Sequence, residues 1–260
     1  MDMKVGLFVC DDADHWGNEE GAGEWLMKRY NIDTEDEEIE WKLFKIISET
    51  LPTQTEIKEF EAFIIPGSEH SANEDEEWID ELEDFIRYVY YLQRETPDRS
   101  PKLIGVGFGH HAICRALGGV ISENENGSYN AGVRTISTTK DLEENSLYQE
   151  IFGDSVDKIT LFAAHGEEIT ELPGDAVVCA SSEICKNEIV TYGCEIITLQ
   201  GHPEYQIEDF HDIIIPYLQT NEILTEEEIQ AVSDSVEEEC NGQDMMQMII
   251  RYIKSEDIEI

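Results

Sequence analysis

The sequence predicts an α/β fold of three layers, in which a mainly parallel central sheet lies between helices on both of its faces. Short apolar runs of strand length alternate along the chain with longer segments of helical periodicity, which is the pattern that parallel sheets require. The 260 residues are enough for one domain with a full core. We find no internal repeat and no linker long enough to separate a second domain.

Residues 1–100 supply three predicted strands and two predicted helices. Residues 4–9, 39–46 and 62–65 form apolar or alternating runs, which are typical of strands. Helices are expected over 23–30 and 74–92. The apolar face of the second helix consists of Trp78, Leu82, Phe85, Ile86 and Val89.

A strand, a glycine turn and a helix follow one another in the stretch 102–119. The apolar run 103–106 has the length of a strand, and three glycines at alternate positions close or follow it. Residues 111–117 then show helical spacing and end at a Gly-Gly pair. This order is typical of a nucleophile elbow, which presents its central side chain at the carboxyl edge of a parallel sheet. The central residue here is Gly107, which carries no nucleophile.

The second half of the chain supplies further strands and a second motif at the same sheet edge. Strands are expected over 157–162, 176–180 and 195–199. The last of them leads directly into Gln-Gly-His-Pro-Glu-Tyr, residues 200–205. Because the carboxyl ends of parallel strands meet at one edge, we expect this motif to face the elbow.

The chain is expected to divide into a main domain, 1–220, and an acidic C-terminal helical extension, 221–260. Amphipathic patterns predict two helices in the extension, over 226–236 and 244–253. We expect the extension to be packed on the main domain or appended to it as a partner-binding segment.

The elbow and the His-Pro-Glu motif together resemble the class I glutamine amidotransferase family, and most of all its stand-alone branch, which includes γ-glutamyl peptidases. The family's elbow reads Gly-Ile/Val-Cys-x-Gly-His-Gln before a helix that ends in Ala-Leu-Gly-Gly, and its second motif reads Gln-x-His-Pro-Glu-Phe/Tyr. The resemblance covers about 3–218 and implies a flavodoxin-like fold of the family's type. The matching elbow positions are Gly105, Val106, Gly109, His110, Ala116, Leu117, Gly118 and Gly119.

The resemblance implies a catalytic set that is incomplete in this chain. Gly107 stands where the family has its catalytic cysteine. His202 matches the general base, and Glu204 matches the residue that orients it. Without a thiolate no γ-glutamyl thioester forms, so the usual amidase route is closed.

The resemblance also implies residues that bind substrate. Backbone N–H groups of Gly67 or Ser68 and of Phe108 would form the oxyanion hole. His111 stands where the family has a glutamine that holds substrate, and His165 belongs to a His-Gly-Glu tripeptide that matches a family segment near the active site.

Four interpretations of this chain stay open on the sequence. The first, which we expect, is a natural pseudoenzyme with a binding, structural or regulatory role. The second is an engineered or diverged γ-glutamyl hydrolase or amidotransferase. The third is a different enzyme with a metal held by His111, His202 and Glu204. The fourth is an acidic divalent-cation-binding or mineral-associated protein on the same fold.

Two details of the site follow from the same residues. The missing side chain at Gly107 predicts a small space beside His202 and His111, suited to a small anion or a water molecule, and binding of such an anion should weaken as the imidazoles lose protons. Zinc would fit instead if both histidines and Glu204 converged on one point. Cys10 ends the first strand at the same edge and is the thiol that could replace the missing one, although a small apolar strand-end residue is the ordinary interpretation.

The charge of the chain narrows the classes of partner. It carries 59 acidic and 17 basic residues, a net charge of −42. Binding to nucleic acid or to an anionic membrane needs a basic surface, so we expect neither. The charge favours divalent cations or a basic protein, alongside the small amino-acid or γ-glutamyl ligand that the resemblance implies. No cofactor and no resident metal are predicted.

Targeting signals are not evident in the sequence. It has no basic start followed by an apolar run, and no run approaches the roughly 18 apolar residues of a membrane helix. The six cysteines are then expected to be reduced thiols, and we expect a cytoplasmic protein.

Overall fold

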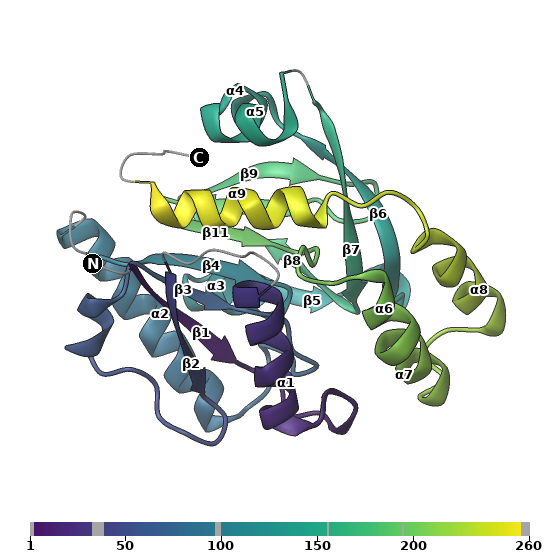
Figure 1. Ribbon diagram of the computed structural model, residues 1–260, viewed down its shortest axis with the longest axis horizontal. Coiled ribbons are helices and arrows are strands. Elements are labelled where there is room, and N and C mark those ends of the chain that lie inside the picture. Colours follow the sequence, from purple (N-terminus) through teal and green to yellow (C-terminus); the bar gives the residue numbers. More distant parts are fainter. Residues whose placement is uncertain (1–2, 33–38, 97–99, 155, 194, 256–260) are drawn as a thin grey trace.

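The computed structural model has the predicted three layers, with helices on both faces of a central sheet (Figure 1). It describes residues 3–32, 39–96, 100–154, 156–193 and 195–255. Within them, nine strands form one sheet in the order β2-β1-β3-β4-β11-β10-β9-β6-β7.

One half of the sheet is parallel throughout, as the sequence predicts. Each strand pairs in parallel with its neighbour, and the pairing aligns Val106 at the end of β4 with Leu199 at the end of β11. This register brings the elbow next to the segment that follows β11. The five strands are β1 (Met3–Val9), β2 (Ile39–Lys45), β3 (Ala62–Ile65), β4 (Lys102–Val106) and β11 (Ile196–Leu199).

The other half of the sheet is antiparallel, and the apolar pattern of the sequence predicts only two of its strands. The predicted ones are β7 (Lys158–His165) and β9 (Ala176–Ser181), and the missed ones are β6 (Asn130–Thr138) and β10 (Ile189–Tyr192). Because β6 and β10 run opposite to the rest, seven of the nine strands still point the same way. A separate two-stranded sheet, β5 (Val120–Glu123) with β8 (Glu167–Glu171), was also missed.

Helices cover both faces of the sheet (Figure 1). On one face α1 (Asn18–Met27), which continues into a π-helical turn at Lys28–Ile32, and α9 (Gly242–Lys254) share one hydrophobic core. On the other face α2 (Glu77–Glu95) and α3 (Phe108–Ala116) share a second core. Helix α1 begins five residues before the predicted start, directly after Gly17, whose φ of 82° lies in the left-handed region.

The remaining helices are short or lie at the rim. Both helices of the C-terminal extension pack on the main domain, since α8 contacts the core around Phe210 while α9 crosses the sheet. Among the described residues, no helix has the length and apolarity needed to span a membrane. The short helices and turns outside the two main helix pairs are α4 (Lys140–Glu144), α5 (Ser146–Phe152), α6 (Ile207–Asp209), a π-helical turn (Phe210–Ile214), α7 (Ile215–Thr220), α8 (Glu226–Ser235) and 3-10 turns at Asp14–Trp16, Glu56–Glu59 and Glu125–Gly127.

Candidate functional site

The elbow has the sharp turn that its sequence predicts. Gly107 lies between the last residue of β4 and the first residue of α3, with φ 54° and ψ −108°. A positive φ at this point is the conformation that glycine tolerates best. The N–H of Gly107 donates to the carbonyl of Leu199, 2.9 Å away, so β11 holds the turn in place.

His202 is fixed beside the elbow by three contacts. Its backbone N–H donates to the carbonyl of Phe162 at 2.8 Å, and its ring Nδ1 lies 2.9 Å from Oε1 of Glu204. The ring stacks on Tyr205 with centroids 4.2 Å apart and planes 6° from parallel. A carboxylate only accepts hydrogen bonds, so Nδ1–H is the donor in this contact.

The imidazole of His202 fills the space where a side chain of residue 107 would start. A Cβ built on Gly107 would lie 2.6 Å from Cε1 and 2.9 Å from Nε2 of His202, and 3.4 Å from Cα of Gly67. A Cβ on Gly67 would also lie 2.6 Å from Cε1. The expectation of a small empty space at the elbow is therefore wrong. The imidazole ring of His202 occupies that space.

The predicted oxyanion residues lie on the two segments that meet at the elbow. The loop after β3 is tied to the elbow, since the N–H of Gly109 donates to the carbonyl of Pro66 at 3.1 Å. Phe108 begins α3, and the first N–H groups of a helix have no acceptor within the helix. Ser68 lines the adjoining cavity, but its hydroxyl donates to the carbonyl of Cys10.

His111 and His165 lie deeper in the cavity as neutral imidazoles. His111 Nε2 is 2.9 Å from Oε1 of Gln200, and burial lowers the pKa of His111 to about 4. His165 Nδ1 is 2.9 Å from the backbone carbonyl of Glu167, and burial lowers the pKa of His165 to about 3. With pKa values this low, neither ring carries a charge near neutral pH, so His111 adds no positive charge for an anion there.

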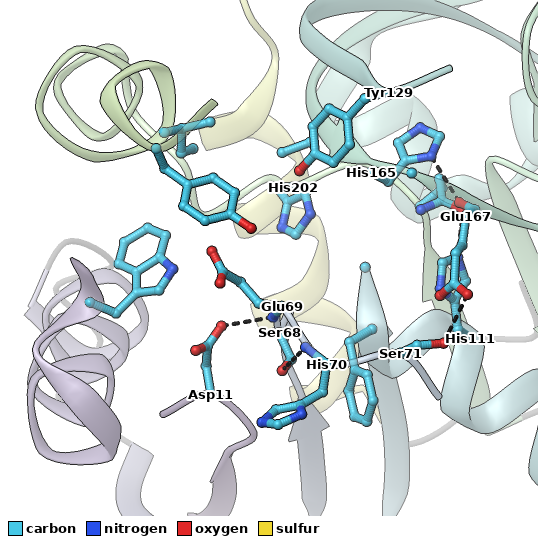
Figure 2. A pocket seen from close by; sticks show the side chains of 18 of the residues that line it. Asp11, Ser68, Glu69, His70, Ser71, His111, Tyr129, His165, Glu167 and His202 are labelled. Carbon is cyan, nitrogen blue, oxygen red and sulfur yellow. Dashed lines mark hydrogen bonds between the residues drawn. The ribbon is translucent and has the colours of Figure 1, made fainter. Parts of the chain in front are cut away.

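The adjoining cavity is acidic and aromatic. Its volume is about 270 Å³, and none of the residues that line it is a lysine or an arginine. Asp11 is buried and accepts from the N–H of Glu69, while burial and the neighbouring Asp11 raise the pKa of Glu69 to about 7. Figure 2 shows these two on the opposite side of the cavity from Tyr129. The wall also includes Trp16, Glu74, Glu167, Tyr205 and Tyr217.

The family model named Glutamine amidotransferase class-I matches residues 28–215 of the chain. The chain belongs to this family.

Curated relatives in the amidotransferase family cover about three quarters of the chain. Gamma-glutamyl peptidase 3 of Arabidopsis thaliana is 32% identical over 200 residues, which are 74% of this chain and 76% of the relative. A putative glutamine amidotransferase of Saccharomyces cerevisiae is 26% identical over 210 residues, 78% of each chain. A crystal structure of a glutamine amidotransferase from Thermotoga maritima has the same fold, with a TM-score of 0.68 at 17% identity, covering 98% of this chain and 100% of that one.

This amidotransferase chain has no thiol at the site among the described cysteines. Cys10 directly follows β1 in a fully buried position, and burial raises the pKa of its thiol well above the usual range. None of the five described cysteines lines the cavity, so Cys10 does not replace the missing nucleophile. The sixth cysteine, Cys194, lies outside the described residues.

The amidotransferase site does not bring its histidines together as metal ligands. Within the described ranges, no three His, Cys, Asp or Glu side chains are placed to hold a metal ion. Nε2 of His111 bonds to Gln200 and Nδ1 of His202 bonds to Glu204, so these groups do not converge on one point. The zinc arrangement considered from the sequence is therefore wrong.

Several residues of the amidotransferase cavity were missed because they come from distant segments. Asp11, Glu69, Tyr129 and Tyr217 meet only when the sheet edge is assembled. The acidic stretch that follows β1 was a signal for the first of them, and the segment 128–132, a weakened form of a family segment, was a signal for Tyr129, whereas no local pattern marked Glu69 or Tyr217. Gln200 was named only as part of a motif, although the residue lines the cavity and its buried Nε2 has no partner within the described residues.

Proposed function

We propose that this chain is a catalytically silent class I glutamine amidotransferase that binds a small amino-acid or γ-glutamyl ligand without hydrolysing it. The observation that carries the proposal is the pairing of Gly107 with His202. The elbow offers no nucleophilic atom, and the imidazole lies where the side chain of a nucleophile would begin.

The chemistry that remains does not replace the lost step. Loss of a covalent nucleophile typically lowers turnover by a factor of about a million. His202 keeps its partner Glu204, but a general base needs a nucleophile or a water molecule placed for attack. Ser68 and Ser71 line the cavity, yet the Ser68 hydroxyl donates to the carbonyl of Cys10 and the Ser71 hydroxyl donates to the carboxylate of Glu167, so neither is hydrogen-bonded to His202.

The cavity retains features that suit a γ-glutamyl ligand. Its 270 Å³ is room for a small molecule, and the unpartnered Nε2 of Gln200 can donate to a ligand carbonyl or carboxylate. The carboxylates of Asp11 and Glu69 suit a ligand ammonium group. Relatives named gamma-glutamyl peptidases support this choice of ligand class.

Calorimetry with γ-glutamylglycine, followed by NMR of the recovered dipeptide, tests the proposal. We expect saturable binding and intact dipeptide. A Gln200→Leu variant should bind about tenfold more weakly because it lacks the donor, whereas Gln219→Leu, at an exposed position on α7, should bind like the original chain. Absence of binding at millimolar dipeptide, or release of glutamate that disappears in a His202→Ala variant, would contradict the proposal.

A further inference from the structure

A second cavity lies behind the His-Glu pair, between α9 and the loop that carries Glu204. Its volume is about 420 Å³, within the usual range of small-molecule sites. The loop side consists of Arg29, Pro203, Glu204, Tyr205 and Gln206. The helix side consists of Gln243, Met246, Gln247, Ile250, Arg251 and Lys254, whose spacing places them on one face of α9.

The second cavity differs in charge from the first. Four carboxylic side chains and no lysine or arginine line the elbow cavity, whereas Arg29, Arg251 and Lys254 line this one with a single carboxylate, Glu204. Three of the chain's 17 basic residues therefore meet at one hollow of a molecule with net charge −42. This concentration favours a ligand with an anionic group.

Arg251 and Lys254 are the basic residues that α9 contributes to the lining of this cavity. Arg29 is buried and already donates to both carboxylate oxygens of Asp209 at 2.8 Å. Arg251 pairs with Glu150, but both side chains are about half exposed, and such surface pairs contribute little. Lys254 follows Arg251 by three residues, so their side chains are neighbours on the helix.

Glu204, which lines the loop side, has an unsatisfied acceptor. Its side chain is 1% exposed, and Oε1 accepts from His202 Nδ1. Within the described part of the chain, the buried Oε2 has no hydrogen-bond partner. A buried carboxylate oxygen without a donor is costly, so this atom favours a ligand that brings an N–H group.

We propose that this cavity binds a small zwitterion, an amino acid whose carboxylate meets Arg251 and Lys254 and whose ammonium group donates to Oε2 of Glu204. The helix side of the site lies beyond residues 28–215, the part that matches the family model. The site is separate from the elbow cavity, although Tyr205 lines both. Because Glu204 orients His202, a ligand that bonds to Oε2 of Glu204 also restrains the Glu204–His202 pair.

Methyl NMR of methionine tests this site directly. Met246 lines the cavity, whereas Met27 ends α1 and does not line it. The Met246 methyl signal therefore reports binding in the cavity, and the Met27 signal reports nonspecific effects of the probe. The probe is 6-aminohexanoate, whose two charged ends are separated by a flexible chain. We expect it to shift the Met246 signal in a saturable way and to leave Met27 unchanged. Hexanoate and hexylamine, each with one of the two groups, should require at least about tenfold higher concentration.

Paired charge variants separate the site from general electrostatics. Arg251→Gln with Lys254→Gln should weaken binding of 6-aminohexanoate by about tenfold or more. Lys58→Gln with Arg94→Gln removes the same charge from exposed positions elsewhere and should leave the affinity unchanged. No shift of Met246 at tens of millimolar probe, equal affinity for hexanoate, or equal losses in both double variants would overturn the proposal. None of these outcomes depends on turnover or on binding in the elbow cavity. The proposal for this second cavity can therefore fail while the proposed function stands, and the reverse.

Discussion

The contact between Gly107 and His202 determines what the elbow can do. The turn needs a positive φ, and the imidazole beyond it is held by Glu204 and Tyr205. Any side chain at residue 107 must therefore accept an unfavourable backbone conformation and displace a ring that is held on two sides.

A Gly107→Ala variant measures that collision. Gly127→Ala is the matched control, because its φ of 65° is similar and a Cβ there would meet nothing within 4 Å. We expect the free energy of unfolding to fall by about 1–3 kcal/mol more in Gly107→Ala than in the control, the usual cost of overpacking. Equal losses in urea denaturation would mean that the ring moves aside freely.

The buried imidazole of His111 should make stability depend on pH. Its folded pKa of about 4 lies below the usual value of 6.5, so the unfolded chain binds the proton more readily between these values. Stability from this group is complete above pH 6.5 and is lost as the pH falls toward 4. Glu69 and Glu188, whose pKa values burial raises to about 7, have the opposite effect, since their ionisation destabilises the folded chain as the pH rises.

Comparison with His111→Gln isolates the histidine from those carboxyl groups. Relative to the variant, the original chain should lose up to about 1.4 kcal/mol of unfolding free energy per pH unit between pH 6.5 and 4. Urea titrations of both proteins at pH 7 and pH 5 give the difference. A difference that is the same at both pH values would show that the ring is not held neutral.

At the scale of elements, the sequence predicts those strands that are apolar runs and those turns that neighbouring residues alone determine. The parallel strands around the elbow and the meeting of Gly107 with His202 could be predicted, because a strand–glycine–helix pattern and a His-Pro-Glu motif mark one sheet edge. Strand β6 could not, since Asn130 and Gly132 disfavour a strand and only pairing with β7 makes it one. The position of the His202 ring depends on packing against Tyr205, which no local pattern encodes.

The packing of α9 predicts that the C-terminal extension is part of the folded domain. Ile249 is 1% exposed and belongs to the core that α1 also enters. An Ile249→Ala variant should lose about 2–5 kcal/mol of unfolding free energy, while Gln247→Ala, exposed on the same helix, should change it by less than about 0.5 kcal/mol. Equal stabilities of the two variants in urea would place α9 outside the cooperative unit.

At the scale of the whole molecule, the net charge of −42 opposes the compact state. Screening by salt and weak binding of divalent cations to surface carboxylates should both relieve this repulsion. We expect the melting temperature to rise with sodium chloride, and to rise further with calcium chloride at equal ionic strength. A melting temperature that responds to neither salt would mean that the acidic surface does not limit stability.

The rate of γ-glutamyl hydrolysis tests the central claim most directly. Purified protein and its His202→Ala variant are incubated with γ-glutamylglycine and with glutamine, and released glutamate is measured. Because Gly107 supplies no nucleophile, we predict that the two proteins give the same rate, equal to that of buffer. Glutamate release by the original chain that exceeds buffer and is lost in His202→Ala would contradict the claim.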